Sequence, residues 1–359
     1  MPSYRPDLES IPTYTPGKPI DEVSRELGIT EIAKLASNEC PVEPFPEVQQ
    51  AIAAAAADVH RYPDTGGYHL VNALAARLGV EPDNIWLGAG SSQLLGCAAL
   101  AVGGPGTSAV FADPSFVMYP IGTMISGAEP VQVPLDAAWR HDLDAMLAAI
   151  RDDTTVVYVC NPNNPTGTYR TATDVDAFID TVPERVLVIV DEAYHEYVTT
   201  DDHRSAIGHA VGRDNVVVMR TFSKVYGLAG LRIGYAVGTP ATLEALRRTQ
   251  APFSANTLAQ VAALEAMRHE ERLAERVAQN DRGRRQLGAG LAARGIEHAP
   301  SQANFVALWT SDDPGEVADR LLQLGVIVRR LGSMLRVSVG TEAENARFLE
   351  ALDEIGVKL

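Results

Sequence analysis

The sequence predicts an α/β fold, with a large domain built on a mostly parallel sheet flanked by helices and a small α+β domain after it. Short apolar runs alternate with helical segments between residues 85 and 237, and strands that are apolar on both faces are typical of parallel sheets covered by helices. From residue 249 onward, long helices replace this alternation. We therefore expect an N-terminal arm at 1–30, a large domain at 31–248 and a small domain at 249–359 that the arm joins.

The individual elements follow from hydrophobic periodicity and turn residues. In the alternating region we expect strands at 85–87, 108–112, 130–133, 155–160, 186–190, 215–219 and 233–237. Helices are expected at 46–57, 68–78, 93–101, 117–126, 143–150 and 175–181. The C-terminal region should contain helices at 257–267, 270–294, 315–324 and 343–355 and strands at 304–309, 326–329 and 335–339. Recurring prolines disfavour regular structure in the arm, which we expect to be extended and to lie on other parts of the protein.

Composition limits the class of protein. The 359 residues are 46% hydrophobic and 21% charged, which is typical of a globular chain. The net charge of −16 argues against nucleic acid as a partner, because phosphate backbones attract basic surfaces. An anionic substrate must therefore be held by local arginines.

Cysteine usage and hydropathy indicate the compartment. Cys40, Cys97 and Cys160 are far apart and lack metal-ligand spacing, so we interpret them as reduced thiols and expect no metal. No stretch resembles a signal peptide or a membrane span. We therefore expect a cytoplasmic protein that does not bind membranes.

The stretch from Arg220 to Tyr235 carries the first candidate for catalysis. Lys224 follows an apolar strand, lies between hydroxyl residues and precedes Arg232 by eight positions. This pattern suits an amine that forms a Schiff base beside a bound phosphate. Taken alone, the same stretch would also fit a solvated loop lysine.

A second candidate site begins at the glycine-rich segment 88–92. A strand, a glycine turn and the start of a helix place Ser91 and Ser92 where amide groups and the helix dipole attract anions. A tight turn with serine caps explains this segment equally well.

Polar residues at the expected strand ends give the strongest physical argument. Phe116, Asn164, Asp191 and Lys224 each follow a different strand, and parallel sheets bind ligands at the carboxyl ends of their strands. Burying Asp191 is costly unless a cation pairs with it, and a protonated pyridine nitrogen is such a cation. Tyr194 could then reach the phenolic oxygen of the same ring. Alternatively, Asp191 is a helix cap and Tyr194 a core aromatic residue.

Three motifs carry a resemblance to a known family, namely N-P-N-N-P-T-G at 161–167, D-E-A-Y at 191–194 and T-F-S-K-V-Y-G-L-A-G-L-R at 221–232. Together they resemble the fold-type I pyridoxal-phosphate aminotransferases, and most of all the histidinol-phosphate aminotransferase family with its aromatic aminotransferase relatives. The similarity extends from residues 14–17 to residues 335–340. It implies a transaminase with pyridoxal 5'-phosphate as cofactor.

The resemblance also implies roles for individual residues. Lys224 would form the Schiff base and move the proton, and Asp191 would keep the pyridine nitrogen protonated. Tyr194 and Asn164 would hydrogen-bond the phenolic oxygen, and Phe116 would stack on the ring. The residues expected to bind the phosphate are Ser91, Ser92, Thr221, Ser223, Arg232 and, from the partner subunit of a homodimer, Tyr62.

On the substrate side the resemblance implies that Arg336 binds an α-carboxylate and that Arg329 faces a distal phosphate. The other residues expected to line the substrate pocket are Tyr14, Asn38 and Asn164. Arg336 could otherwise be an exposed arginine on a strand. The segments 40–43 and 330–334 depart from the family pattern, and both lie where the amino donor would bind.

Three functions follow as hypotheses. The first is a 2-oxoglutarate-dependent transaminase for histidinol phosphate, with an aromatic amino acid such as phenylalanine or tyrosine as the alternative donor. The second is a decarboxylase of a phosphorylated amino acid on the same fold. The third is a cofactor-binding sensor of a transcription regulator, which the acidic chain with its short arm disfavours because it has no room for a basic DNA-binding module.

Overall fold

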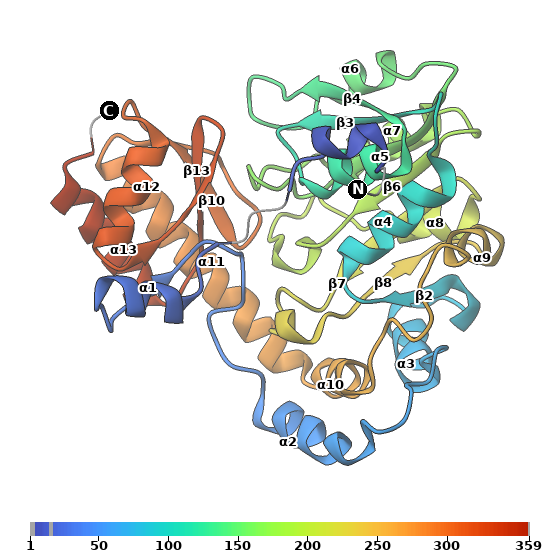
Figure 1. The fold of residues 1–359 in the computed structure, drawn as a ribbon, viewed down its shortest axis with the longest axis horizontal. Coiled ribbons are helices and arrows are strands. Elements are labelled where there is room, and N and C mark those ends of the chain that lie inside the picture. Colours follow the sequence, from blue (N-terminus) through green and yellow to red (C-terminus); the bar gives the residue numbers. More distant parts are fainter. Residues whose placement is uncertain (1–3, 14–16, 358–359) are drawn as a thin grey trace.

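The computed structural model describes residues 4–13 and 17–357. It has a large part around a seven-stranded sheet and a smaller part around a four-stranded sheet, and the long helix α11 (Glu270–Ala293) runs from one to the other (Figure 1). No helix in the described residues combines the length and apolar character needed to cross a bilayer.

The large sheet confirms the predicted α/β class. Its strand order is β2-β8-β7-β6-β5-β3-β4. The neighbours from β7 to β4 pair in parallel, whereas β8 is antiparallel to both β7 and β2. The strands are β2 (Ile85–Gly88), β3 (Ser108–Asp113), β4 (Glu129–Pro134), β5 (Thr154–Cys160), β6 (Leu187–Asp191), β7 (Val216–Thr221) and β8 (Gly234–Val237).

Helices cover both faces of this sheet, which explains why its strands are apolar throughout. In β5, for example, Val157 and Val159 belong to one hydrophobic cluster, whereas Tyr158 and Cys160 belong to the cluster on the opposite face. This is the alternation that a strand with two buried faces requires. The helices of the large part are α2 (Pro46–Ala55), α3 (Tyr68–Leu78), α4 (Ser91–Val102), α5 (Met118–Ser126), α6 (Leu143–Ala148), α7 (Ala172–Thr181), α8 (Ile207–Gly212), α9 (Pro240–Arg247) and α10 (Thr257–Met267).

The smaller part packs helices against an antiparallel sheet of order β12-β13-β10-β9. The range expected to be one strand, 326–329, is divided between two sheets, because β11 pairs in parallel with the N-terminal strand β1 while β12 pairs with β13. The elements of the smaller part are β1 (Ala33–Lys34), β9 (Glu297–His298), β10 (Phe305–Trp309), β11 (Val326–Ile327), β12 (Arg329–Leu331), β13 (Met334–Ser338), α12 (Pro314–Gln323) and α13 (Glu342–Ile355).

The N-terminal arm is more ordered than its prolines suggested, which corrects the expectation of an irregular segment. It contains a 3-10 turn, Pro6–Ser10, and helix α1 (Ile20–Leu27). Pro19 precedes the first turn of α1, where a proline costs no hydrogen bond, and Gly28 ends the helix in a left-handed conformation. The arm lies on both parts, since Arg5 donates to carbonyls at the end of α5 and Val23 packs against Ile327 (Figure 1).

Candidate active site

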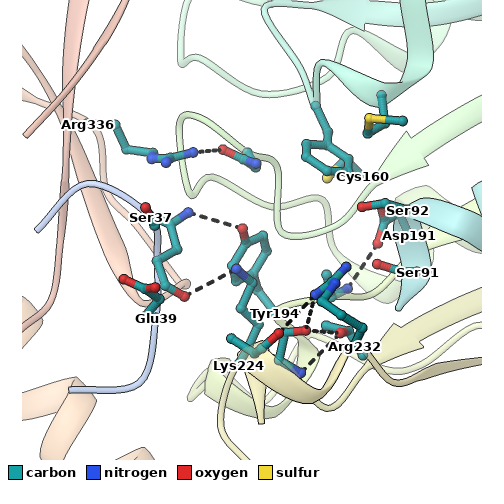
Figure 2. Close-up of a pocket in the computed structure, with 18 residues that line it drawn as sticks. Ser37, Glu39, Ser91, Ser92, Cys160, Asp191, Tyr194, Lys224, Arg232 and Arg336 are labelled. Carbon is teal, nitrogen blue, oxygen red and sulfur yellow. Dashed lines mark hydrogen bonds between the residues drawn. The ribbon is translucent and has the colours of Figure 1, made fainter. Parts of the chain in front are cut away.

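A cavity of about 480 Å³ opens at the carboxyl ends of β5, β6 and β7 and faces β13 of the smaller part (Figure 2). The residues that follow these strands thus lie together at the carboxyl edge of the sheet, as the sequence predicted. The sequence-predicted residues that line this cavity are Asn38, Ser91, Ser92, Phe116, Asn164, Asp191, Tyr194, Thr221, Ser223, Lys224, Arg232 and Arg336.

Lys224 stands in the middle of the cavity wall, just after β7. Its Nζ donates a hydrogen bond to the carbonyl of Asn38 at 3.2 Å and lies 5.3 Å from the ring centre of Tyr194. Removal from water, reinforced by the nearby charge of Arg336, lowers the pKa of Lys224 to about 7. An amine with this pKa is neutral and nucleophilic in a large share of molecules near neutral pH.

Asp191 ends β6 and is 1% exposed. The hydroxyl of Tyr119 donates to its Oδ2 at 2.9 Å, and the amide of Ala193 donates to its Oδ1 at 3.2 Å. Both donors are neutral, and burial raises the pKa of Asp191 to about 6. The carboxyl therefore favours a cationic or N–H-bearing ligand in the cavity beside it.

Tyr194 and Asn164 lie on the side of the cavity nearest the smaller part. The hydroxyl of Tyr194 accepts a hydrogen bond from Asn38 Nδ2 at 3.1 Å, and burial raises the pKa of this phenol. Asn164 Oδ1 accepts from Arg336 Nη1 at 2.6 Å (Figure 2). Arg336 Nη2 donates to the carbonyl of Ala36 at 2.8 Å.

The opposite end of the cavity forms an anion cradle. Ser91 and Ser92 open helix α4, whose exposed amides and positive dipole attract an anion. Arg232 Nη1 donates to Ser223 Oγ at 3.3 Å, and Thr221 Oγ1 donates to the same Ser223 oxygen at 2.9 Å. Together these groups provide the hydroxyls and the guanidinium fork that a phosphate monoester requires.

Two glycines make room for the cradle. A Cβ at Gly90, which has a φ of +80°, would lie 2.5 Å from Arg232 Nη2, and a Cβ at Gly234 would lie 2.7 Å from the amide of Ser91. Larger side chains would therefore displace the arginine or the start of α4. The close approach of three backbone segments explains why glycine recurs in this part of the sequence.

A second cavity, of about 410 Å³, extends from Phe116 and Asn164 toward β12 and β13. Arg329 lies on its wall directly opposite Arg336 in the strand pairing. Trp139 closes another side and stacks on Trp309, with ring centres 4.1 Å apart. This cavity thus combines two guanidinium groups with an aromatic and apolar wall.

One predicted residue, Tyr62, lines neither of these cavities of its own chain. Tyr62 is 80% exposed and stacks on Phe253 at 4.3 Å. Tyr14 lies outside the described residues.

Sequence reasoning also missed three residues that line the cavities or contact a residue that does. Tyr119 follows Phe116 by one helical turn, a spacing that could have identified it, whereas Trp139 and Glu39 reach the cavities only through the fold. In the described part of the chain no three His, Cys, Asp or Glu side chains lie close enough to hold a metal ion.

An amine at a strand end, a buried carboxylate and an anion cradle on one α/β sheet define a class of enzyme that binds a phosphorylated pyridine aldehyde. Residues 30–352 match the sequence profile of the family described as aminotransferase class I and II. The chain belongs to this family, and within it to the histidinol-phosphate aminotransferases and their aromatic aminotransferase relatives.

Individual relatives support this assignment. The chain is 43% identical to the histidinol-phosphate aminotransferase of Moorella thermoacetica over 99% of this chain and 93% of the relative. It is 45% identical to an aromatic amino acid aminotransferase of Thermobifida fusca over 97% of this chain and 96% of the relative. The crystal structure of the Sinorhizobium meliloti histidinol-phosphate aminotransferase in complex with pyridoxal-5'-phosphate superposes with a TM-score of 0.90 at 32% identity, covering 98% of this chain and 97% of that one.

Proposed function

We propose that the protein is a cytoplasmic pyridoxal 5'-phosphate-dependent transaminase that exchanges an amino group between histidinol phosphate and 2-oxoglutarate. The observation that carries this proposal is the placement of Lys224 between the buried Asp191 and the anion cradle of Ser91, Ser223 and Arg232. Lys224 would react with the aldehyde carbon of the cofactor, Asp191 would face its ring nitrogen, and the anion cradle would bind its phosphate.

The bound cofactor supplies an electron sink that stabilises negative charge at the substrate Cα. Lys224, with a pKa of about 7, accepts and returns the Cα proton near neutral pH. Asp191 would keep the ring nitrogen of the cofactor protonated, and Tyr119 fixes this carboxylate through a hydrogen bond to Oδ2. Tyr194 and Asn164 would hold the cofactor through its phenolic oxygen, and Phe116 would pack against its ring.

The two arginines bind the substrate's anionic groups against an overall charge of −16. Arg336 is held by Asn164 and by the carbonyl of Ala36, and its guanidinium plane suits bidentate binding of an α-carboxylate. Arg329 lies opposite it on the neighbouring strand and also lines the second cavity. There it would bind the distal carboxylate of glutamate, or share with Arg336 the phosphate that histidinol phosphate carries in place of an α-carboxylate.

An aromatic amino acid is the second candidate donor. The wall formed by Trp139, Leu331 and Met334 favours a ring without a phosphate, and the Thermobifida fusca relative bears the aromatic name. Both donors carry a planar ring, and they differ in the group next to the amino-bearing carbon, which is a phosphate ester in histidinol phosphate and a carboxylate in an aromatic amino acid.

Single half-reactions decide between the donors. Histidinol phosphate, phenylalanine, tyrosine and glutamate are added one at a time to the purified yellow protein, and the loss of its visible band is followed. Fast loss with histidinol phosphate and slow loss with phenylalanine would support the first assignment, and the reverse would support the second. Release of carbon dioxide without consumption of a 2-oxo acid would overturn both.

We also propose a homodimer in which Tyr62 reaches the phosphate of the neighbouring site. Tyr62 and Phe253 form an exposed aromatic pair, which favours a protein partner. Mixing a Lys224→Ala chain with a Tyr62→Ala chain tests this proposal, because a hybrid dimer regains one site with both side chains. Activity well above that of either variant alone is expected, and its absence in mixtures that do form hybrids would contradict the shared site.

A further inference from the structure

The segment that follows the N-terminal arm is built into the smaller part of the protein. The amide of Ala33 donates to the carbonyl of Gly325 at 2.9 Å, and the amide of Leu35 donates to that of Ile327 at 2.8 Å. At the end of β13, the amide of Ser338 donates to the carbonyl of Leu35 at 2.8 Å. The segment is therefore part of the smaller part's hydrogen-bonded framework, although it precedes the whole of the large sheet in the sequence.

Asn38 ends this segment in a left-handed conformation, with a φ of +53°. The hydroxyl of Ser338 binds it twice, accepting from the amide of Asn38 at 2.8 Å and donating to Asn38 Oδ1 at 3.0 Å. Asn38 is 1% exposed and Ser338 3% exposed. One buried hydroxyl thus fixes both the backbone and the side chain of Asn38.

From this position Asn38 contacts two reactive groups of the large part. Its carbonyl accepts from Lys224 Nζ at 3.2 Å, and its Nδ2 donates to the hydroxyl of Tyr194 at 3.1 Å. Asn304 Nδ2 donates to the same carbonyl at 3.1 Å. Figure 2 shows Lys224 and Tyr194 on the cavity wall that faces Ser37 and Glu39, the neighbours of Asn38 in the chain.

We propose that Ser338 is a positioning residue that acts through Asn38 to orient the amine of Lys224 and the hydroxyl of Tyr194, and so joins the placement of the smaller part to the reactivity of the lysine. The inference rests on the proposed role of Lys224. Ser338 itself does not line the 480 Å³ cavity that contains Lys224. It lies two residues beyond Arg336 on β13, so the strand that binds the substrate carboxylate also carries the hydroxyl that aims the lysine.

The hydroxyl matters because Lys224 is free to rotate whenever the substrate, and not the lysine, is joined to the cofactor. A carbonyl that accepts one N–H of the amine directs its lone pair, which must face the Cα proton for transfer. The charged groups that face the amine are Arg336, Glu39, Arg232 and Asp191, and the Ser338→Ala substitution leaves all of them in place.

The test compares Ser338→Ala with two controls. Ser338→Thr restores the hydroxyl, and Ser108→Ala removes a fully buried serine hydroxyl at the start of β3, where its partners are Asp153 and Thr154. The first readout is the rate at which the cofactor-free full-length chain captures pyridoxal 5'-phosphate as a function of pH, since only the neutral amine reacts. The second readout is kcat and KM of the loaded enzyme.

The wild-type capture rate should rise through about pH 7, the pKa of Lys224. Loss of a fixed acceptor disfavours the charged amine, so Ser338→Ala should move this midpoint down by roughly half a unit to one unit. It should lower kcat roughly tenfold with little change in KM, because Arg336 keeps its partners. Ser338→Thr should return both quantities toward wild type, and Ser108→Ala should change neither.

An unchanged midpoint and an unchanged kcat in Ser338→Ala would overturn the inference. Parallel shifts in Ser108→Ala would overturn it as well, because they would reveal a general effect of destabilisation. Should Ser338→Ala not fold, Asn38→Gly replaces it, since glycine keeps the left-handed backbone and the carbonyl while losing the side chain that Ser338 binds. A wild-type chain that fails to capture the cofactor would contradict the proposed function itself.

Discussion

Arg329 and Arg336 are direct cross-strand partners in the antiparallel pairing of β12 with β13. Like charges in this position oppose each other and destabilise a sheet by a few tenths of a kcal/mol up to about 1 kcal/mol. The two residues also line the same cavity. A pairing that is unfavourable for the sheet but places two cations on one cavity is best explained by binding of a substrate with two negative charges, either the two carboxylates of glutamate or one phosphate dianion.

Substitution of Arg329 should separate the candidate substrates. Arg329→Gln should raise KM for histidinol phosphate and for 2-oxoglutarate by roughly 10- to 100-fold, since each loses a charge-assisted pair. KM for phenylalanine should change little, because its single carboxylate charge is bound by Arg336. Steady-state kinetics with each substrate measures this, and an equal loss for phenylalanine would contradict a second anion-binding role of Arg329.

Lys224→Ala should leave a folded protein without the visible band and without turnover. The substitution removes the only amine that lines the main cavity among the described residues. Absorbance spectra and the half-reaction with glutamate provide the measurement, with circular dichroism as the control for folding. A yellow, active Lys224→Ala protein would refute the central assignment.

Asp191→Asn should reduce kcat by roughly 10²- to 10³-fold, because a neutral amide cannot stabilise a protonated ring nitrogen. Tyr119→Phe removes the 2.9 Å hydrogen bond that fixes the carboxylate but keeps the charge, so its effect should be smaller. The measurement is kcat of both variants, and Asp191→Asn should show the larger loss. Near wild-type rates for Asp191→Asn would exclude its role at the nitrogen.

Glu192, the neighbour of Asp191, should act on stability and not on chemistry. Its Oε2 accepts from Arg220 Nε at 2.9 Å and from Nη2 at 2.8 Å, in a pair that is nearly fully buried. Glu192→Gln leaves the Arg220 charge unpaired and should lower the free energy of unfolding by about 3–5 kcal/mol. Urea unfolding measures this, with the exposed Glu47→Gln, which pairs with Arg272, as a control expected to stay close to wild type.

The contribution of Glu192 also has a defined dependence on pH. Burial raises its pKa, but Arg220, His195 and hydrogen bonds from Ala206 and Ser205 outweigh burial, so the folded pKa lies below the ordinary 4.5. The stabilisation is therefore fully present above pH 4.5 and is lost as the pH falls through the folded pKa. The stability difference between wild type and Glu192→Gln should shrink in acid, and a difference that grows there would contradict the ion pair.

The class of fold and the centre of the site could be predicted from the sequence because their signals are local. Lys224, Asp191 and Asn164 follow apolar strands, and parallel topology brings such strand ends together. Most strands lie within a few residues of the predicted ranges. Helices α8 and α9 were missed because each is short, and α1 because proline content hid a well-capped helix.

Residues that act through tertiary contacts could not be predicted in this way. Ser338 and Asn38 are 300 positions apart in the chain, and Trp139 meets Trp309 only across the two parts. The domain limits at 30 and 248 stay a prediction. The pairing of β1 with β11 shows, however, that residues 33–34 lie with the smaller part.

The outer edge of the large sheet bears on how the chain avoids self-association. The amide of Glu129 points inward to Thr107, so by alternation the nitrogens of Pro130 and Pro134 lie on the open side of β4, where a proline has no hydrogen to donate. A second chain that approached this edge during refolding would find Gln132 as its main backbone donor on β4. The prolines thus protect a concentrated, partly folded population from edge-to-edge aggregation, without any contribution to the chemistry at the far ends of the strands.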